Sequence, residues 1–274
     1  MAVRVEILTI GTELVTGLVV NTNGAWLARR VTAVGGHVTR IVTVRDDEGE
    51  IVGALREALS RAEVVITTGG LGPTPDDMTM ACVAKALGRR LVLNEEALEM
   101  VRRTYAILYE EGVVKSPEMT PEREKMAMLP EGAEPLPNPV GAAPGAAIEH
   151  EGRLVFCLPG VPREMERMYE ESVEPRLRRL TGASLSVTAT LKLDCTDESS
   201  IAGVIREASR AFPWAYIKSH PGRLAREGRI NVTVTVFAGD AETLSTRLEE
   251  VERFLKERFK NMGIRVISSD ENHQ

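Results

Sequence analysis

Residues 64–77, VVITTGGLGPTPDD, join a short apolar run to a turn rich in glycine and proline. The apolar run Val64–Thr68 has the length of a strand and no polar alternation, which is typical of a strand buried in a parallel sheet. Three glycines follow it at once, at positions 69, 70 and 72. Glycine can adopt a positive φ and lets other groups approach the backbone closely. The stretch therefore predicts a buried strand that ends in a tight turn with an accessible backbone.

Strand-like and helix-like segments alternate on both sides of that turn. Further strands are expected over residues 3–10, 37–44 and 153–158, with a short extended piece over residues 90–92. Helices are expected over residues 23–34, 48–62, 77–87, 95–111 and 163–180. This rhythm predicts an α/β domain whose mostly parallel sheet carries helices on both faces. Sheets of this kind bind ligands at the carboxyl ends of their strands.

A second pattern begins after Thr181-Gly182, where we expect a domain boundary. The segments beyond it are expected in the order strand, helix, strand, strand, helix, over residues 185–193, 199–211, 215–219, 229–237 and 241–261. That order predicts a small two-layer α+β domain of about 90 residues, a common domain size. The chain is therefore expected to consist of one domain over residues 1–180 and another over residues 181–274.

Composition excludes several classes of protein. The 274 residues include 34 Lys and Arg against 40 Asp and Glu, a net charge of −6, and no apolar run approaches the roughly 20 residues that cross a bilayer. The N-terminal apolar stretch contains Glu6 and lacks a small-residue cleavage site, which argues against a signal peptide. Cys82, Cys157 and Cys195 form no CxxC pair, so neither a disulfide framework nor a zinc site is indicated. A reducing cytoplasm is the expected location.

The net charge lies wholly in the first domain. Residues 181–274 hold 13 basic and 13 acidic side chains, and the first 180 residues hold the other 21 and 27. Neither half has the basic excess expected of a domain that binds nucleic acid. Nucleic acid is therefore an unfavoured partner.

Residues 113–147 are rich in proline and glycine. One interpretation of this segment is a disordered linker. However, segments that favour helix and strand enclose it on both sides, and long irregular loops inside a compact domain are usually functional. We therefore favour an ordered loop that faces a ligand.

Glycine-bearing turns stand at three expected strand ends, at Gly11-Thr12-Glu13, at Gly69–Asp77 and at Gly160-Val161-Pro162. Any one of them could merely close a tight corner between a strand and a helix. Three runs of backbone amides at one sheet edge together indicate an anion-binding cradle. None of the turns matches GxGxxG or GxxxxGK[ST], so a nicotinamide enzyme and a P-loop ATPase are disfavoured.

Asp76 and Asp77 lie next to each other at the end of the second turn. They could simply cap the following helix and complement its dipole, an effect of about 0.5–2 kcal/mol. Alternatively, the two carboxylates and the phosphates of a ligand would repel one another unless a divalent cation lay between them. Mg²⁺ and Mn²⁺ accept such oxygen ligands and need no His or Cys. Since the four histidines are dispersed, a hard, oxygen-bound metal is the only kind that the sequence indicates.

Four blocks of the sequence resemble the signature blocks of the CinA (competence/damage-inducible) family: GTELVTGLVVNTNGAWLARRVTAVGGHV, TTGGLGPTPDDMT, NPVGAAPG and LPGVPREM. The resemblance implies an N-terminal domain of the molybdopterin-binding MoaB/Mog-like superfamily, with three layers and a mostly parallel sheet. Through Asp197-Glu198-Ser199 and Ser219-His220-Pro221, the second domain is similar to the KH-like or ferredoxin-like domain of CinA proteins. Many CinA proteins continue into a nicotinamide-mononucleotide deamidase domain, an activity that is not expected of a chain stopping at Gln274.

The resemblance also implies a chemistry. N-terminal CinA domains are similar to metal-dependent pyrophosphatases that split ADP-ribose into AMP and ribose 5-phosphate, whereas the related molybdopterin enzymes adenylylate molybdopterin. In those enzymes the second block typically reads TGGTG followed by Arg-Asp. Here Leu71 replaces the second Thr, Asp76 replaces the Arg, and Asp77 takes the place of the catalytic Asp. We therefore expect a hydrolase of ADP-ribose, or of a related nucleotide, that depends on a divalent metal (Mg, Mn or Co).

Each part of the expected site has its own residues. Asp77 and Asp76 are expected to hold the metal and act in catalysis. Glu13 is expected to orient the attacking water or complete the metal shell, unless it is simply a solvated carboxylate. Lys125 or Arg163 could screen developing charge, although the alternative for each is a solvated side chain. The residues expected to bind phosphate and nucleoside are Gly11, Thr12, Gly69, Gly70, Gly72, Thr74, Asn138, Gly141, Gly145, Gly160 and Pro162.

Two other functions are open alternatives. The first is a protein that binds a pterin or nucleotide without turnover, in a cofactor-biosynthesis-related or regulatory role. The second is an RNA-binding C-terminal domain, suggested by Arg223, Arg226 and Arg229 and opposed by that domain's neutral charge and by the lack of a GxxG loop. A small-molecule nucleotide is the expected substrate, a membrane is not an expected partner, and the superfamily implies a homo-oligomer, either a dimer or a trimer.

Overall fold

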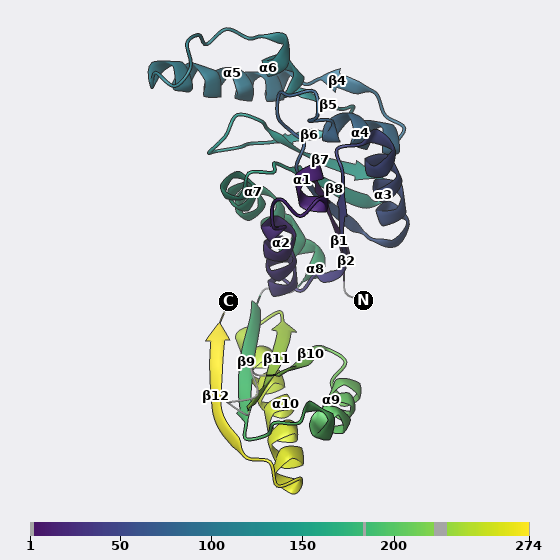
Figure 1. The fold of residues 1–274 in the computed structure, drawn as a ribbon, viewed down its shortest axis with the longest axis vertical. Coiled ribbons are helices and arrows are strands. Elements are labelled where there is room, and N and C mark those ends of the chain that lie inside the picture. Colours follow the sequence, from purple (N-terminus) through teal and green to yellow (C-terminus); the bar gives the residue numbers. More distant parts are fainter. Residues whose placement is uncertain (1–2, 183–184, 222–228, 274) are drawn as a thin grey trace. The chain divides into compact units, whose positions relative to one another are not determined.

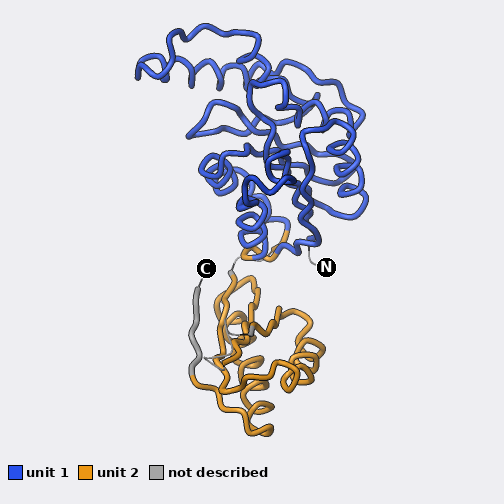
Figure 2. Tube along the Cα trace, viewed as in Figure 1, with its two compact units in different colours: residues 1–32, 36–180 blue, residues 33–35, 181–274 orange. Residues whose placement is uncertain are grey.

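The computed structural model describes residues 3–182, 185–221 and 229–273. The chain divides into unit 1, residues 1–32 with 36–180, and unit 2, residues 33–35 with 181–274 (Figure 2). Each unit has an apolar core of its own. No described helix is both long and apolar enough to cross a bilayer.

Unit 1 is built on a six-stranded sheet (Figure 1). In spatial order its strands are β2 (His37–Val44), β1 (Arg4–Ile10), β3 (Val64–Thr68), β8 (Arg153–Leu158), β7 (Gly145–His150) and β6 (Glu134–Leu136). The first four strands run parallel to one another, and β7 is antiparallel to both of its neighbours. Every residue of β3 is buried, as expected of a central strand. The predicted α/β fold with a mostly parallel sheet is therefore confirmed.

The register of the sheet brings three strand ends level with one another. Thr68 at the end of β3 pairs with Thr9 of β1 on one side and with Leu158 of β8 on the other. The turns that begin at Gly11, Gly69 and Gly160 therefore meet at one edge of the sheet. This edge is the carboxyl end of the parallel strands, where ligands bind in folds of this type.

Helices cover both faces of this sheet. α3 (Glu48–Arg61), α4 (Thr79–Ala86) and the first turns of α5 (Glu95–Glu110) share one core with it. α2 (Thr22–Ala33), α7 (Pro162–Met168) and α8 (Glu174–Thr181) lie on the other side of the sheet from α3 (Figure 1). Strand β1 buries side chains on both faces of the sheet, because successive side chains of a strand point to opposite faces. Leu8 belongs to the first core, and its neighbour Ile7 is buried outside that core.

The helix predicted over residues 163–180 is interrupted in the structure. A π-helical turn, η1 (Tyr169–Val173), separates α7 from α8. Pro175 follows this turn, and it has no N–H to donate to the carbonyl of Glu171. The wider turn accommodates the missing hydrogen bond. The spacing of apolar residues alone does not predict such a turn.

The segment 113–147 is more regular than the predicted loop. It contains α6 (Pro121–Lys125), β5 (Met128–Pro130), β6 and the start of β7, and β5 pairs with β4 (Leu91–Leu93). The Arg123 guanidinium orders the part before α6, because it donates to the carbonyl oxygens of Ser116 at 2.9 Å and Glu118 at 2.6 Å. The segment is ordered, as we expected, but its short helix and strands were not predicted, because strands of three residues flanked by proline carry no periodic signal.

Unit 2 is a four-stranded antiparallel sheet with two helices on one face. Its elements are β9 (Leu185–Leu193), α9 (Glu198–Ala211), β10 (Ala215–Pro221), β11 (Ile230–Ala238), α10 (Ala241–Asn261) and β12 (Val266–His273). The last strand was not predicted, because the stretch VISSDENH is too polar to indicate one. The order β10-β11-β9-β12 and the βαββαβ sequence are ferredoxin-like rather than KH-like. Arg229 is exposed, whereas Arg223 and Arg226 lie outside the described residues.

The three cysteines are expected to differ sharply in reactivity. Burial raises the pKa of the Cys82 thiol to about 11 and that of Cys157 to about 12, so at pH 8 both are protonated and shielded, whereas Cys195 is partly exposed. Because the thiolate is the nucleophile, a chromogenic disulfide reagent should titrate one thiol quickly and the other two only after unfolding. Cys195→Ser should abolish the fast phase, and a fast phase that survives this substitution would contradict the assignment.

Candidate functional site

The three turns at the sheet edge enclose a pocket of about 540 Å³. Its lining falls into three kinds of residue. The glycines are Gly11, Gly69, Gly70, Gly72 and Gly160. The carboxylates are Glu13, Asp46, Asp76, Asp77 and Glu164. The apolar side chains are Ile10, Leu71, Pro73, Tyr105, Met126, Ala142, Ala143, Pro159 and Val161.

Gly69 lines the pocket and has a backbone that only glycine adopts readily. Its φ is +111°, and a Cβ at this position would overlap the carbonyl oxygen of Ile10 on the neighbouring strand. Its N–H donates to the Leu158 carbonyl at 3.0 Å. The predicted role of this amide in binding phosphate is therefore wrong, since the Gly69 N–H is already engaged within the sheet.

The amides that follow Gly69 are unengaged. Within residues 3–182, the N–H groups of Gly70, Leu71 and Gly72 donate no hydrogen bond, nor does that of Gly160 across the pocket. Gly70 has a φ of +69°, and Thr79 fixes this bend by donating its hydroxyl to the Gly69 carbonyl at 2.7 Å. Consecutive free amides in such a bend form a nest that suits an anion.

Asn23 and Thr68 hold two of the turns together. The Asn23 side-chain amide donates to the Thr68 hydroxyl at 3.1 Å and to the Gly160 carbonyl at 2.8 Å. Thr68 in turn donates to the Pro159 carbonyl at 2.7 Å. The spacing between the amides of the second and third turns is therefore fixed before a ligand binds. The Asn23 role was not predicted, although the Asn-Thr-Asn sequence after the first turn marks the position.

The structure separates the roles of Asp76 and Asp77. Asp77 Oδ2 accepts hydrogen bonds from the Thr74 amide at 2.9 Å and from the Thr74 hydroxyl at 2.6 Å. α4 begins only at Thr79, after Met78, and no side chain caps it. The alternative in which these aspartates cap the helix is therefore wrong, as is the predicted helix start at residue 77. Asp77 closes a turn, while Asp76 is exposed and accepts no hydrogen bond within the described residues.

Asp46 belongs to the pocket and was not predicted there. Its Oδ2 accepts from the Thr12 amide at 2.8 Å and from the Thr12 hydroxyl at 2.9 Å. This contact fixes the start of the short helix α1 (Thr12–Val15), which carries Glu13. The Glu13 carboxylate folds back over Gly11, where a Cβ would approach Glu13 Oε1 to 2.5 Å. The only sequence signal for Asp46 was its place just after the strand expected over residues 37–44.

Glu164 is a second pocket carboxylate that was not predicted. Asn138, the expected nucleoside contact, lies outside the lining and donates to Glu164 at 2.7 Å and to the Ala143 carbonyl at 3.0 Å. Gly141 leaves space for the same carboxylate. Asn138 and Gly141 therefore lie next to the Glu164 carboxylate and do not line the pocket themselves.

Four other predicted contacts also lie outside the pocket lining. Gly145 sits inside β7, where a Cβ would crowd the Cys157 carbonyl oxygen, so this glycine serves packing. Pro162 is the first residue of α7. Thr12 and Thr74 act through the carboxylates of Asp46 and Asp77.

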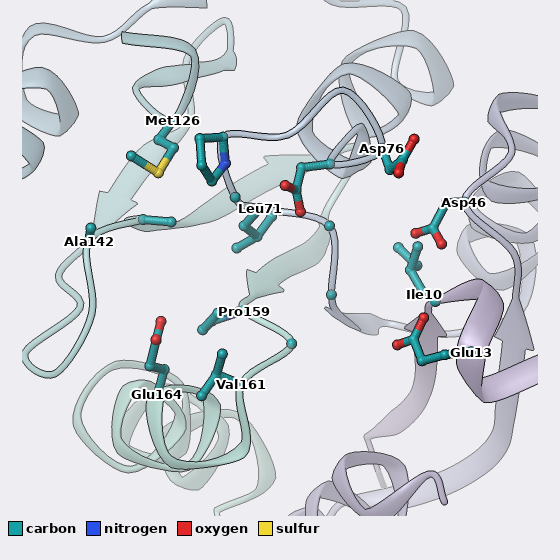
Figure 3. A pocket seen from close by; sticks show the side chains of 18 of the residues that line it. Ile10, Glu13, Asp46, Leu71, Asp76, Met126, Ala142, Pro159, Val161 and Glu164 are labelled. Atoms are coloured by element: carbon teal, nitrogen blue, oxygen red, sulfur yellow. The ribbon is translucent and has the colours of Figure 1, made fainter. Parts of the chain in front are cut away.

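The pocket is acidic, and its lining includes no lysine, arginine or histidine among the described residues. Figure 3 shows Glu13, Asp46 and Asp76 gathered on one side and Met126 and Ala142 on the other. Lys125 donates to the Thr74 carbonyl, in the turn that carries both aspartates, whereas Arg163 is exposed on α7 and does not line the pocket. Within the described residues, no three His, Cys, Asp or Glu side chains converge as a complete metal cage.

The fold and this pocket define an α/β domain with a row of unengaged amides at the carboxyl edge of its parallel strands. Residues 6–179 match the family model described as a probable molybdopterin binding domain, MoCF_biosynth, and the chain belongs to this family. The match covers most of unit 1 and confirms the MoaB/Mog-like domain that the four sequence blocks implied.

Similar proteins agree with this assignment. The crystal structure of the CinA protein of Thermoplasma acidophilum, described as of unknown function, is 39% identical, covers 64% of this chain and 98% of its own, and has a TM-score of 0.59. A protein of Pyrobaculum calidifontis is 45% identical over 264 residues, 94% of this chain and 98% of its own. A protein of Thermococcus kodakarensis is 46% identical over 248 residues, 90% of this chain and 95% of its own. The chain is thus CinA-like.

Proposed function

We propose that unit 1 binds an organic phosphate of the molybdopterin or nucleotide kind in this pocket, in a role related to cofactor biosynthesis or regulation that needs no turnover. The observation that carries the proposal is the row of unengaged amides at Gly70, Leu71 and Gly72, three residues that line the same pocket as Gly160, whose amide is also unengaged within the described residues. The family description names molybdopterin, which favours this binding function over the hydrolase expected from the Asp76-Asp77 pair.

The acidic lining restricts which anions can bind. A phosphate close to several carboxylates is repelled by them in a partly enclosed site. The amides offset part of this repulsion, and N–H or O–H groups elsewhere on the ligand offset more by donating to the carboxylates. An organic phosphate with a polar ring or sugar is therefore a better ligand than inorganic phosphate alone.

Narrowing the pocket at Gly160 tests this function. A Cβ at Gly160 would meet Gly69 Cα at 3.4 Å, an ordinary contact, so Gly160→Ala should fold normally while narrowing the space beside the free amides. We expect the dissociation constant for AMP or molybdopterin to rise about tenfold, measured by calorimetry. Gly53→Ala is the matched control, because Gly53 lies in α3 with no atom near its Cβ position. Equal binding by both variants would contradict the proposal.

A second candidate function is the metal-assisted hydrolysis of ADP-ribose, and one observation favours it. Asp76, Asp77 and Glu13 line the same pocket as the free amides. Carboxylate oxygens are the kind of ligand that Mg²⁺ and Mn²⁺ accept, and these ions are commonly held by one or two carboxylates, with waters and substrate phosphates completing the shell. A cation bound there would supply neutralisation of the diphosphate charge and Lewis acidity.

The chain's own residues would bind the two phosphates and orient the attacking water. The Gly70–Gly72 amides would hold one phosphate, Gly160 would contact the other, and Glu13 would orient the attacking water. Thr74 would keep Asp77 in place through its two hydrogen bonds. Product analysis after incubation with ADP-ribose separates the two candidates, because tight binding without AMP release supports binding alone.

A further inference from the structure

Apolar side chains line the side of the pocket across from Glu13 and Asp46, and they share that side with the Glu164 carboxylate. Figure 3 shows Met126 and Ala142 across the pocket from Asp46 and Glu13. Tyr105 and Ala143 also line it. Met126 and Ala143 are buried, and Tyr105 packs partly against the core. The pocket therefore offers a ligand two unlike surfaces, with the amide nest of the sheet edge also in its lining.

Tyr105 stands out among the apolar residues of the lining because its ring is held by Arg123, a residue that does not line the pocket. The guanidinium carbon of Arg123 lies 3.8 Å from the ring centroid, a cation–π contact. Arg123 is itself held by the carbonyl oxygens of Ser116 and Glu118. A ring that is held in place loses little conformational entropy when a ligand contacts it.

We propose that Tyr105, held by Arg123, is the residue that selects ligands carrying a flat heterocyclic ring next to their phosphate. This inference rests on the proposed phosphate-binding function. The nest binds the phosphate, and the wall of Tyr105, Met126 and Ala142 contacts the ring. A sugar phosphate without a ring fills only the polar part of the pocket. The volume of about 540 Å³ lies in the range of sites that enclose small organic ligands.

The test compares AMP with ribose 5-phosphate, which differ by the adenine ring. Calorimetry on the full chain is expected to show that wild type prefers AMP by at least tenfold, since stacking of a base on an aromatic ring has about this effect or more. Tyr105→Leu keeps an apolar side chain for core packing and removes the ring. This variant should raise the dissociation constant for AMP about tenfold and leave that for ribose 5-phosphate unchanged. Tyr105→Phe should retain the preference.

Tyr109 provides the matched control. It lies one turn further along α5, is 49% exposed, and does not line the pocket, so Tyr109→Leu should bind both compounds as wild type does. Equal affinity of wild type for the two compounds, or equal weakening of both by Tyr105→Leu, would overturn the role of Tyr105 while leaving phosphate binding intact. Binding of neither compound by wild type would overturn the proposed function and this inference with it.

Discussion

Gly69→Ala is expected to lower the free energy of unfolding by about 3 kcal/mol or more. Two costs add at this position. An L-residue is strained at a φ of +111°, and its Cβ would overlap the Ile10 carbonyl oxygen. That oxygen belongs to the strand paired with β3, so it cannot move away without disturbing the sheet. For a domain of this size the loss corresponds to a melting temperature lower by roughly 6–12 °C, measured by circular dichroism.

Gly88→Ala separates the two costs. Gly88 has a φ of +66°, but no atom lies within 4 Å of its Cβ position. This variant should therefore show only the backbone strain, about 1 kcal/mol. If Gly69→Ala melts no lower than Gly88→Ala, the close approach of β1 to the second turn is not what requires glycine there.

Residues close together in sequence made the fold and the amide nest predictable. The run Val64–Thr68 with its glycines fixes both a central strand and the bend after it. The parallel fold then brings the turns at Gly11 and Gly160 to the same edge. Each of these steps needs only local periodicity and one general rule about parallel sheets.

The other half of the pocket comes from segments that local patterns do not connect. Asp46, Tyr105 and Glu164 approach the nest from the end of β2, from α5 and from α7. Each stands in a stretch where an acidic residue or a partly buried aromatic is ordinary, so no sequence pattern singles it out. Residues such as Gly141 and Gly145 were predicted to contact ligand, but glycine also makes space for a carboxylate or a strand, and sequence alone does not separate these roles.

Asp77→Asn is the most informative change for the hydrolytic candidate. Asparagine keeps an oxygen that can accept from the Thr74 amide and hydroxyl, so the turn that Asp77 closes should survive. The variant removes only the charge. Under the hydrolytic candidate, we expect AMP release from ADP-ribose with Mg²⁺, Mn²⁺ or Co²⁺ to fall a hundredfold or more, since even indirect metal contacts contribute about 10–100-fold.

Two further measurements keep this result interpretable. Mn²⁺ binding, followed by calorimetry without substrate, should weaken in Asp77→Asn and in Asp76→Asn alike. Thr74→Val retains the charge of Asp77 and loses one of its two hydrogen bonds, so it should lower turnover mildly and leave Mn²⁺ affinity close to wild type. Unchanged turnover in Asp77→Asn would show that the charge of this carboxylate takes no part in the reaction. The acidic side of the pocket would then act by accepting hydrogen bonds from the ligand, as the binding function requires.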